Sequence, residues 1–417
     1  MTHALAFHGG TPVIDLPLPH VPWPLVDDVT IAAVTTQLLT ATSIPDRSGV
    51  IADLEDRLAE YFGVRYAVLA SSGTAALHSA YAALGLGDGD EVIVPAYTFH
   101  ATATPLFHLR ARPVLVDCDL LGNIDPKMVE AAITPATKAI VVTHMWGVPA
   151  QLERLVAIAD SHGLDLVEDG SHAHGATYDG RKVGSFGKAA AFSMNGPKPL
   201  SAGEGGFVLT DDEETYYRTL LHGQYNKRCR TEIPKDHPLS AYAVTGMGLK
   251  LRIHPLAAAL ASDQLDHLDA RLVGRRRIAD RMLADLRDVP GLGIPEVPDG
   301  IEPSWYALAL TLDVAEIGVD PGIALRALHA EGLLEIDQPG STRPMNEHAL
   351  FSRPEGLFPQ VGGDWPRYRE GQFPNAERLH RTTVKFPVPH DDGPVADGYV
   401  RGITKVLTHA HLLQEDL

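Results

Sequence analysis

The sequence has 417 residues, of which 45% are hydrophobic and 21% are charged. This length and composition predict a folded globular protein of two or three domains with a large core. The formal net charge of −18 opposes the phosphate neutralisation on which nucleic-acid binding depends and is repelled by anionic membrane surfaces, so the composition argues against nucleic-acid and membrane partners.

The cysteine content and the N-terminal sequence predict a cytoplasmic protein. Cys118 and Cys229 lie far apart with no CxxC spacing, so neither a disulfide framework nor a zinc site is indicated. The N-terminal residues lack a basic segment followed by an apolar core, and no stretch reaches the ~18 apolar residues of a membrane span.

Residues 1–35 are expected to form an irregular N-terminal arm. Proline is too frequent there for a continuous helix or a central strand. The prolines are Pro12, Pro17, Pro19, Pro22 and Pro24. From Val50 onward the apolar residues follow helical spacing, and this helix is expected to end at Gly63, which suits a C-cap.

The middle of the chain alternates short apolar runs with helical patterns at 75–84, 125–133 and 150–162. The runs predict strands at Tyr66–Ala70, Glu91–Pro95, Pro113–Asp117, Ala139–Thr143, Asp165–Asp169, Ala189–Met194 and Gly206–Thr210. Strands that alternate with helices predict a mostly parallel, doubly wound sheet with helices on both faces. The fold class is therefore α/β, with a large domain over residues 36–265.

The sequence pattern changes near Leu265, where a long helical stretch is followed by Gly- and Pro-rich connections. We expect a smaller α+β domain over residues 266–417. The helical stretch is rich in arginine, which indicates a solvated helix face. Its arginines are Arg271, Arg275, Arg276, Arg277 and Arg281.

Ligands of open parallel sheets bind beyond the carboxyl ends of the strands, and four segments there carry candidate site residues. In the first, Ser72, Gly73 and Thr74 lead from a strand directly into a helix. The start of a helix gathers free N–H groups and the positive end of the helix dipole, which suits a phosphate. Ordinary N-capping by Ser72 or Thr74 explains the same residues.

In the second segment a predicted strand ends at Asp169 and is followed by His172 and His174. A carboxylate in a partly desolvated cleft needs a cation, such as a protonated ring nitrogen. The alternatives are a helix cap at Asp169 with two solvated histidines, or a metal site, although no HExxH or Cys/His spacing accompanies the pair.

The third segment contains Ser193 and then Lys198, which stands between two prolines and precedes a glycine-rich run at 203–206. The prolines exclude a helix interior, and a desolvated lysine is the residue that forms Schiff bases. The alternative is a lysine on a surface turn. The fourth segment ends a strand at Phe99, which suits either stacking at the mouth of the cleft or packing in the core.

Taken together, these segments resemble the DegT/StrS family of pyridoxal-phosphate-dependent sugar aminotransferases. The order and spacing match over roughly residues 50–265. The matching residues are Ser72-Gly73-Thr74, Thr98-Phe99, Glu168-Asp169, His172, Ser193, Lys198 and Gly203-Glu204-Gly205-Gly206. The resemblance implies a fold-type I homodimer with shared active sites, pyridoxal 5′-phosphate as cofactor, no metal, and transfer of an amino group from glutamate or glutamine to a keto sugar or keto cyclitol.

The resemblance also implies roles for single residues. Lys198 is expected to hold the cofactor covalently and to move the proton, and Asp169 to pair with the pyridinium nitrogen. His172 is expected near the phenolic oxygen, and Phe99 against the cofactor ring. Gly73 and Ser193 are expected at the phosphate, together with Ser72 and Thr74.

One position departs from the common family pattern, Gly-x-Asn-x-Arg. The chain has Lys250 in place of the asparagine, followed by Arg252 and His254-Pro255. A lysine there is expected to bind the phosphate of the neighbouring subunit as a full charge. Family members that act on keto-inositols tend to carry such a lysine followed by Arg-x-His-Pro. The resemblance to that branch implies a keto cyclitol of the scyllo-inosose type, from aminocyclitol antibiotic biosynthesis, as acceptor.

Other functions are compatible with parts of the sequence. A nucleotide-linked 3- or 4-keto sugar is the alternative acceptor, and a fold-type I lyase is the alternative enzyme. The intact Lys198 argues against a non-enzymatic regulator and against the dehydratase branch of the family. The loops expected to set specificity are His222–Thr231, Trp305–Tyr306 and Gly340–Met345.

Overall fold

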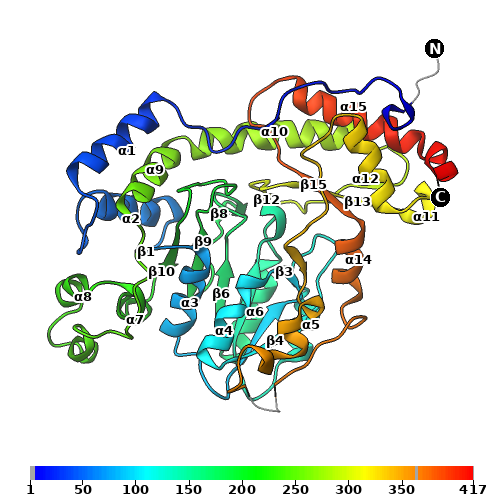
Figure 1. Ribbon diagram of the computed structural model, residues 1–417. Coiled ribbons are helices and arrows are strands. Elements are labelled where there is room, and N and C mark those ends of the chain that lie inside the picture. The colour runs from blue at the N-terminus through cyan, green and yellow to red at the C-terminus, as the bar shows by residue number, and fades with distance from the viewer. Residues whose placement is uncertain (1–4, 362–364, 417) are drawn as a thin grey trace.

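The computed structural model describes residues 5–361 and 365–416. A seven-stranded sheet with the strand order β1-β10-β9-β6-β5-β2-β4 lies at its centre (Figure 1). The strands are β1 (Tyr66–Ala70), β2 (Glu91–Pro95), β4 (Arg112–Val116), β5 (Thr137–Thr143), β6 (Asp165–Asp169), β9 (Ala189–Ser193) and β10 (Gly206–Thr210). All seven predicted strands are present within a residue or two of their expected bounds.

The sheet is mostly parallel, as predicted, but β10 runs antiparallel to both of its neighbours, β1 and β9. A parallel neighbour requires a crossover connection, usually a helix. Between Ser193 and Gly206 the chain forms a loop that contains Lys198 and no helix, so it turns back beside β9. The antiparallel direction of β10 therefore follows from the absence of a crossover helix between β9 and β10.

Helices cover both faces of the sheet. The predicted helices are present as α2 (Gly49–Phe62), α3 (Gly73–Ala83), α5 (Pro126–Ala132) and α6 (Leu152–His162). Alternate residues of β10 face opposite sides, since Val208 packs in the same apolar cluster as α3 whereas Phe207 and Leu209 pack with α2. A doubly covered sheet of this kind buries apolar residues on both faces.

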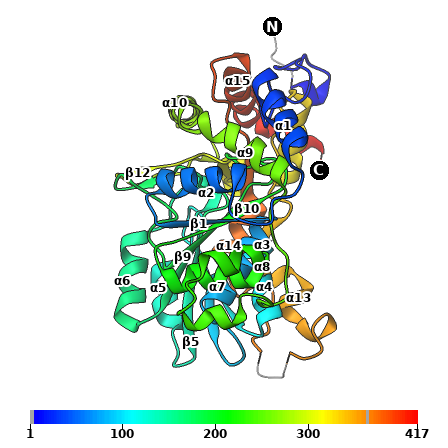
Figure 2. The ribbon, with the colours of Figure 1, turned by 90° about the vertical axis from the view of Figure 1, so that its left-hand side faces the viewer.

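The prediction of an irregular arm through residue 35 is wrong at its end, because α1 (Asp28–Thr40) begins at Asp28. The last proline of the arm is Pro24, so nothing prevents a helix after it, and Asp27 caps the helix by accepting from the N–H groups of Val29 and Thr30. Thr30 then bonds Asp263 of α9 (Pro255–Asp266) at 2.8 Å. Figure 2 shows α1 beside α9.

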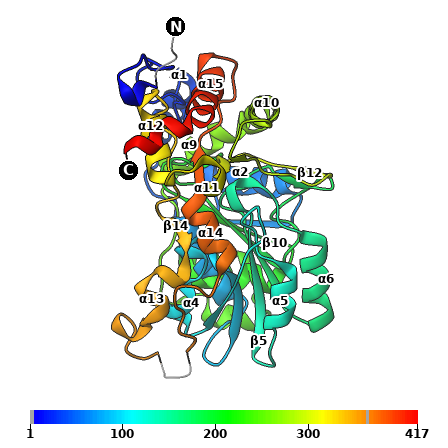
Figure 3. The same ribbon diagram turned by 90° about the vertical axis from the view of Figure 1, so that its right-hand side faces the viewer.

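The C-terminal part of the chain combines helices with a small antiparallel sheet. Its sheet has the order β11-β13-β15, formed by Leu292–Gly293, Leu308–Leu312 and Thr383–Phe386. Around it pack α10 (Leu268–Leu286), α12 (Pro321–Ala330) and α15 (Pro394–Thr408) in one apolar cluster. Apolar side chains between 345 and 361 and between 373 and 379 pack instead with those of the large sheet. Figure 3 shows α13 (Ala349–Ser352) and α14 (Pro374–Thr382) on that side. The division at residue 265 stays a prediction.

Two short pairings join distant parts of the chain. The strand β14 (Thr342–Pro344) pairs with β3 (Tyr97–Phe99) and places Thr342 opposite Phe99. The strand β12 (Ile301–Glu302) pairs with β7 (Thr177–Tyr178), which also pairs with β8 (Arg181–Lys182). Other helices are α4 (Thr104–Leu109), α7 (Glu213–Gly223), α8 (Asn226–Glu232), α11 (Val314–Ile317), α13 (Ala349–Ser352) and α14 (Pro374–Thr382).

The arginine-rich helix α10 is only partly the solvated face that the sequence suggests. Arg277 and Arg281 are exposed and pair with Asp392 and Asp397. Arg275, however, is only 6% exposed. It stands three residues from both Leu272 and Ile278, which are buried, so helical spacing places it on the inner face of the helix.

None of the helices within the described part of the chain is long and apolar enough to cross a membrane.

Candidate active site

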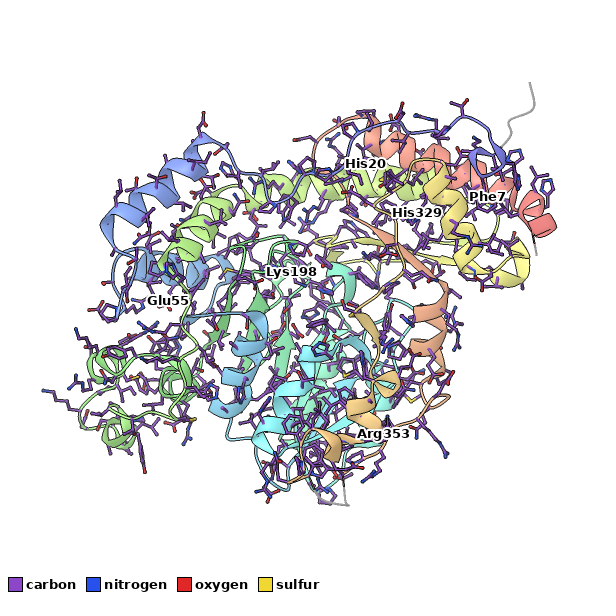
Figure 4. The ribbon with its side chains drawn as sticks, in the orientation of Figure 1. Phe7, His20, Glu55, Lys198, His329 and Arg353 are labelled. Carbon is purple, nitrogen blue, oxygen red and sulfur yellow. The ribbon has the colours of Figure 1, made fainter. Side chains whose placement is uncertain are left out.

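Eight of the nine predicted site residues line one cavity of about 370 Å³. These residues are Ser72, Gly73, Thr74, Phe99, Asp169, His172, Ser193 and Lys198. The cavity lies at the carboxyl ends of β6 and β9 and at the start of α3, where a doubly wound sheet binds its ligands. Figure 4 shows Lys198 between the sheet and α10.

The start of α3 lies directly against the end of β9. Ser72 caps the helix, since its hydroxyl accepts from the N–H of Ala75 at 3.1 Å. A Cβ added at Gly73 would lie 2.5 Å from the Cβ of Ser193, so only glycine allows this approach. The capping interpretation of Ser72 is therefore correct, and the same helix start also presents its remaining N–H groups beside the hydroxyls of Thr74 and Ser193.

Asp169 ends β6 with its carboxylate in the cavity and is 5% exposed. Its Oδ2 lies 2.7 Å from the hydroxyl oxygen of Thr102, and its Oδ1 accepts from the N–H of Ser171 at 3.2 Å. None of the ion pairs found among the described residues includes Asp169. The carboxylate is thus oriented by hydrogen bonds and retains capacity for a cationic partner.

The neighbouring carboxylate, Glu168, points to the other face of the sheet and is fully bonded. Its two oxygens accept from the N–H groups of Gly184, Phe186 and Gly187, and Oε2 lies 3.2 Å from Nε2 of His144. Burial acts to raise the pKa of Glu168, but these bonds outweigh it and lower the pKa. Glu168 is a structural carboxylate, whereas Asp169 faces the cavity.

Lys198 lies in the loop between β9 and β10 and is half-buried. Its N–H bonds the carbonyl of Asn195 at 2.9 Å, and its own carbonyl accepts from the indole N–H of Trp23 at 2.8 Å. Burial lowers the pKa of the Lys198 amine to about 8, although the charge of Asp169 acts to raise it. The interpretation as a solvated surface lysine is wrong, because the amine faces the cavity and Nζ lies 4.4 Å from the centre of the Tyr306 ring.

His172 is stacked on Tyr306, with ring centres 4.2 Å apart and an angle of 16° between the planes. Its Nδ1 is buried without a hydrogen-bond partner in the described structure. Burial, together with the nearby Lys198, holds the pKa of His172 well below its ordinary value, so the ring is neutral. His174 packs against Phe192 and Phe207 in the core. The alternative of two solvated histidines is therefore wrong.

Phe99 is 37% exposed, and its side chain lines the cavity. Packing in the core therefore does not explain this residue. The pairing of β3 with β14 brings Ser341 and Thr342 into the same cavity wall.

No motif marks Thr102. Its place at the site follows only from the fold, which brings the short 3-10 helix η2 (His100–Thr102) against the end of β6. The Trp305–Tyr306 and Gly340–Met345 segments were expected near the substrate, and Tyr306, Ser341 and Thr342 line the cavity. No residue of His222–Thr231 lines it within this chain.

Lys250 is the one predicted site residue outside the cavity. It is exposed, its Nζ lies 5.4 Å from the centre of the Tyr225 ring, and it lines a separate pocket with Thr42, Ser43 and Ile44. The next residue, Leu251, accepts from the N–H of Ser71 at 2.6 Å, so the backbone here borders the turn before α3. Its contact with a neighbouring subunit stays a prediction.

The residues of the cavity fit pyridoxal phosphate. The helix start at Gly73 and the hydroxyls of Thr74 and Ser193 suit a phosphate. Asp169 suits a protonated ring nitrogen, and the unpartnered Nδ1 of His172 suits a polar ring substituent. Lys198 supplies a nucleophilic amine with a lowered pKa.

Comparison with known proteins gives one consistent family. The model of the DegT/DnrJ/EryC1/StrS aminotransferase family matches residues 28–391. The chain is 38% identical to L-glutamine:2-deoxy-scyllo-inosose aminotransferase of Streptomyces kanamyceticus, over 98% of this chain and 98% of that protein. It is 32% identical to dTDP-3-amino-3,4,6-trideoxy-alpha-D-glucose transaminase of Streptomyces venezuelae, over 82% and 83%.

A solved structure agrees with the fold. The aminotransferase of Psychrobacter cryohalolentis superimposes with a TM-score of 0.83 at 28% identity, over 94% of this chain and 100% of that chain. The similarity therefore extends over both the sheet and the C-terminal part of the chain.

Proposed function

Because the chain belongs to the DegT/DnrJ/EryC1/StrS aminotransferase family, we propose that it transfers the α-amino group of glutamine or glutamate to the carbonyl carbon of a keto cyclitol. The donor becomes a 2-keto acid, and the acceptor becomes an amino cyclitol. The chain is an aminotransferase, and its relatives of this family depend on pyridoxal phosphate.

The observation that carries the proposal is the placement of Lys198 and Asp169 in one cavity with the start of α3. When bound there, pyridoxal phosphate would supply an electrophilic carbonyl and an electron sink. Lys198 holds the cofactor covalently and then carries a proton to and from the substrate carbon. Asp169 holds the proton on the ring nitrogen, and Thr102 fixes the carboxylate for that contact.

The other cavity residues bind and orient the cofactor. Ser72, Gly73, Thr74 and Ser193 would bind the phosphate, whose charge the dipole of α3 favours. Phe99 would pack against the ring of the cofactor. Neutral His172, fixed by its stacking on Tyr306, would bind the phenolic oxygen.

Two observations support a cyclitol as the acceptor. The similarity to the 2-deoxy-scyllo-inosose aminotransferase extends over 98% of both chains, further than the 82% and 83% for the dTDP-sugar enzyme. Lys250, Arg252 and His254 also follow the pattern that favours a keto cyclitol over a nucleotide-linked sugar.

Isotope transfer tests this function. The purified protein is incubated with L-glutamine labelled with ¹⁵N at the α-position and with one acceptor in each reaction. The acceptors are 2-deoxy-scyllo-inosose, scyllo-inosose and a dTDP-linked keto sugar. Mass spectrometry should find the label in an amino cyclitol. Label found only in the nucleotide-linked sugar would show that the acceptor is wrong, and release of labelled ammonia without any labelled product would indicate a lyase.

A further inference from the structure

Arg275 is a buried cation without a counterion. Its side chain projects from the inner face of α10 and is 6% exposed, and its Nε has no hydrogen-bond partner in the described structure. None of the ion pairs or side-chain hydrogen bonds found among residues 5–361 and 365–416 includes its guanidinium. An unpaired charge taken out of water is costly, so such an arginine needs an explanation.

The surroundings of Arg275 increase this cost. The guanidinium lies over the ring of Trp23, 4.7 Å from its centre, and Arg271 lies over the same ring at 5.2 Å. Burial lowers the pKa of Arg275 to about 10, and the charge acting on it comes from another cation, Arg271. The aromatic face offsets part of the charge but does not replace an anion.

A second buried arginine shows how this chain pairs such a group when its role is structural. Arg228 is 2% exposed. Its two terminal nitrogens each lie 2.8 Å from an oxygen of Glu55, and its Nε lies 2.7 Å from Glu232. Arg275 has nothing equivalent. The contrast indicates that the partner of Arg275 is a ligand.

Arg275 lines a cavity of about 660 Å³ that adjoins the Lys198 cavity. The two share Pro197, Tyr306, Ser341 and Thr342 in their walls. Trp23 also links them, because its indole N–H bonds the Lys198 carbonyl while its ring lies under Arg275. An anion bound at Arg275 would therefore lie in the cavity next to the one that contains Lys198.

Other charged residues line this cavity without pairing with Arg275. They are Glu335, Asp337 and Lys385. The carboxylate of Glu335 already accepts from the N–H of Val21 at 3.1 Å, and that of Asp337 from the N–H of Gln338 at 2.8 Å.

We propose that Arg275 binds the α-carboxylate of the amino-acid donor. This inference rests on the proposed function. The keto cyclitol carries no charge, whereas an amino-acid donor carries a carboxylate on the same carbon as the amino group that it gives up. A guanidinium fork matches a carboxylate with two parallel hydrogen bonds, and this pairing orients the donor as well as holding it.

Binding of an unreactive donor analogue tests the site without chemistry. Glutaramate is glutamine without its α-amino group, so it keeps the carboxylate but cannot react. Calorimetry on the cofactor-loaded protein should show that Arg275→Gln weakens glutaramate binding about 10- to 100-fold, the loss expected for a charge-assisted bond. Arg275→Lys keeps the positive charge but not the forked guanidinium, so its affinity for glutaramate should lie between those of wild type and Arg275→Gln. Arg277→Gln, on the exposed side of the same helix, should bind as wild type does.

Reactivity gives a second, independent readout. The loss of the cofactor's visible absorption is followed after addition of glutamine or of 4-aminobutanamide, which is glutamine without its carboxylate. Arg275→Gln should slow the reaction with glutamine about 10- to 100-fold and leave that with 4-aminobutanamide unchanged. An equal loss with both amines, or glutaramate binding no weaker than in Arg277→Gln, would overturn the proposal.

Two further measurements separate the possible failures. If Arg275 is structural, Arg275→Met should lower the melting temperature of the ligand-free protein, whereas an unpaired ligand-binding arginine predicts an unchanged or higher one. A wild-type protein that binds glutaramate through Arg275 but accepts no amino group would contradict the proposed function and support the carboxylate site. Amino transfer that is unaffected by Arg275→Gln would contradict the site alone.

Discussion

Lys198 is the residue on which the account depends most. With a pKa of about 8, about one molecule in ten carries the free amine at pH 7, against about one in 3000 at the ordinary pKa of 10.5. Lys198→Ala should abolish amino transfer and the absorption band of the lysine-linked cofactor, while the fold, followed by circular dichroism, and some cofactor binding survive. Lys235→Ala, at an exposed lysine, should behave as wild type. Turnover by Lys198→Ala would show that another lysine acts.

The pH dependence of cofactor loading reports the same amine. Below the pKa the amine is protonated and cannot attack a carbonyl, so the loading rate of the cofactor-free protein should rise with pH and level off above about 8. Because the charge of Asp169 raises this pKa, Asp169→Asn should move the midpoint to lower pH. Stopped-flow absorbance at a series of pH values measures both. A midpoint near 10.5 would show that Lys198 is solvated.

Asp169→Asn should also lower turnover by about 10²- to 10³-fold, the loss typical of one preorganised electrostatic contact. A neutral amide does not hold the ring proton, so the electron sink weakens. Steady-state assays with glutamine measure the effect. Thr102→Val removes only the hydrogen bond that orients the Asp169 carboxylate, so it should lower turnover less than Asp169→Asn does. Turnover within a few-fold of wild type would leave Asp169 with a purely structural role.

At the scale of elements, the close approach of α3 to β9 forms the proposed phosphate site. The Cβ of Gly73→Ala would lie 2.5 Å from the Cβ of Ser193 and 2.9 Å from its Cα, so the helix start has to move. We expect weaker cofactor retention and a free energy of unfolding lowered by about 1–3 kcal/mol, as for other overpacked sites. Equilibrium dialysis and urea denaturation measure the two effects.

Gly356→Ala is the matched control for this glycine, because a Cβ there meets no atom within 4 Å. Retention of the cofactor by Gly73→Ala at the level of Gly356→Ala would contradict the assignment of the α3 start to the phosphate.

Local patterns predicted the large sheet well because its strands are short apolar runs that alternate with helices. The same patterns placed Asp169 at the end of a strand and Lys198 in the loop after the next strand, and the topology brings the two together. The patterns could not show that β14 pairs with β3, or that Tyr306 stacks on His172, since these contacts join segments far apart in the sequence. A run of arginines suggests a helix face in solvent, but helical spacing turns Arg275 towards the inner face of α10.

At the scale of the whole molecule, the assembly as a homodimer stays a prediction that the surface near Lys250 supports. Large apolar side chains are exposed there, at Tyr242, Val244, Met247 and Leu249. Such a patch is typical of an interface. Within one subunit, the groups proposed to bind the cofactor phosphate are hydroxyls and N–H groups, which carry no full positive charge. A lysine from a second subunit would supply that charge.

Lys250→Ala should therefore weaken cofactor retention and make it depend more steeply on protein concentration. Because binding and assembly are linked, the cofactor should strengthen the dimer by the same factor by which dimerisation tightens cofactor binding. Sedimentation with and without cofactor measures both. Unchanged dimerisation and cofactor affinity in the variant would place Lys250 in solvent.

Reductive trapping of the cofactor on the chain shows directly whether Lys198 holds it. Borohydride reduces the covalent bond between an enzyme lysine and pyridoxal phosphate to a stable one, and peptide mass spectrometry then locates it. We expect the added mass on the peptide that contains Lys198. It should be lost when glutamine is added before the reductant, because the amino group then resides on a cofactor released from the lysine. Labelling of another lysine, or labelling of Lys198 that glutamine does not prevent, would contradict the account.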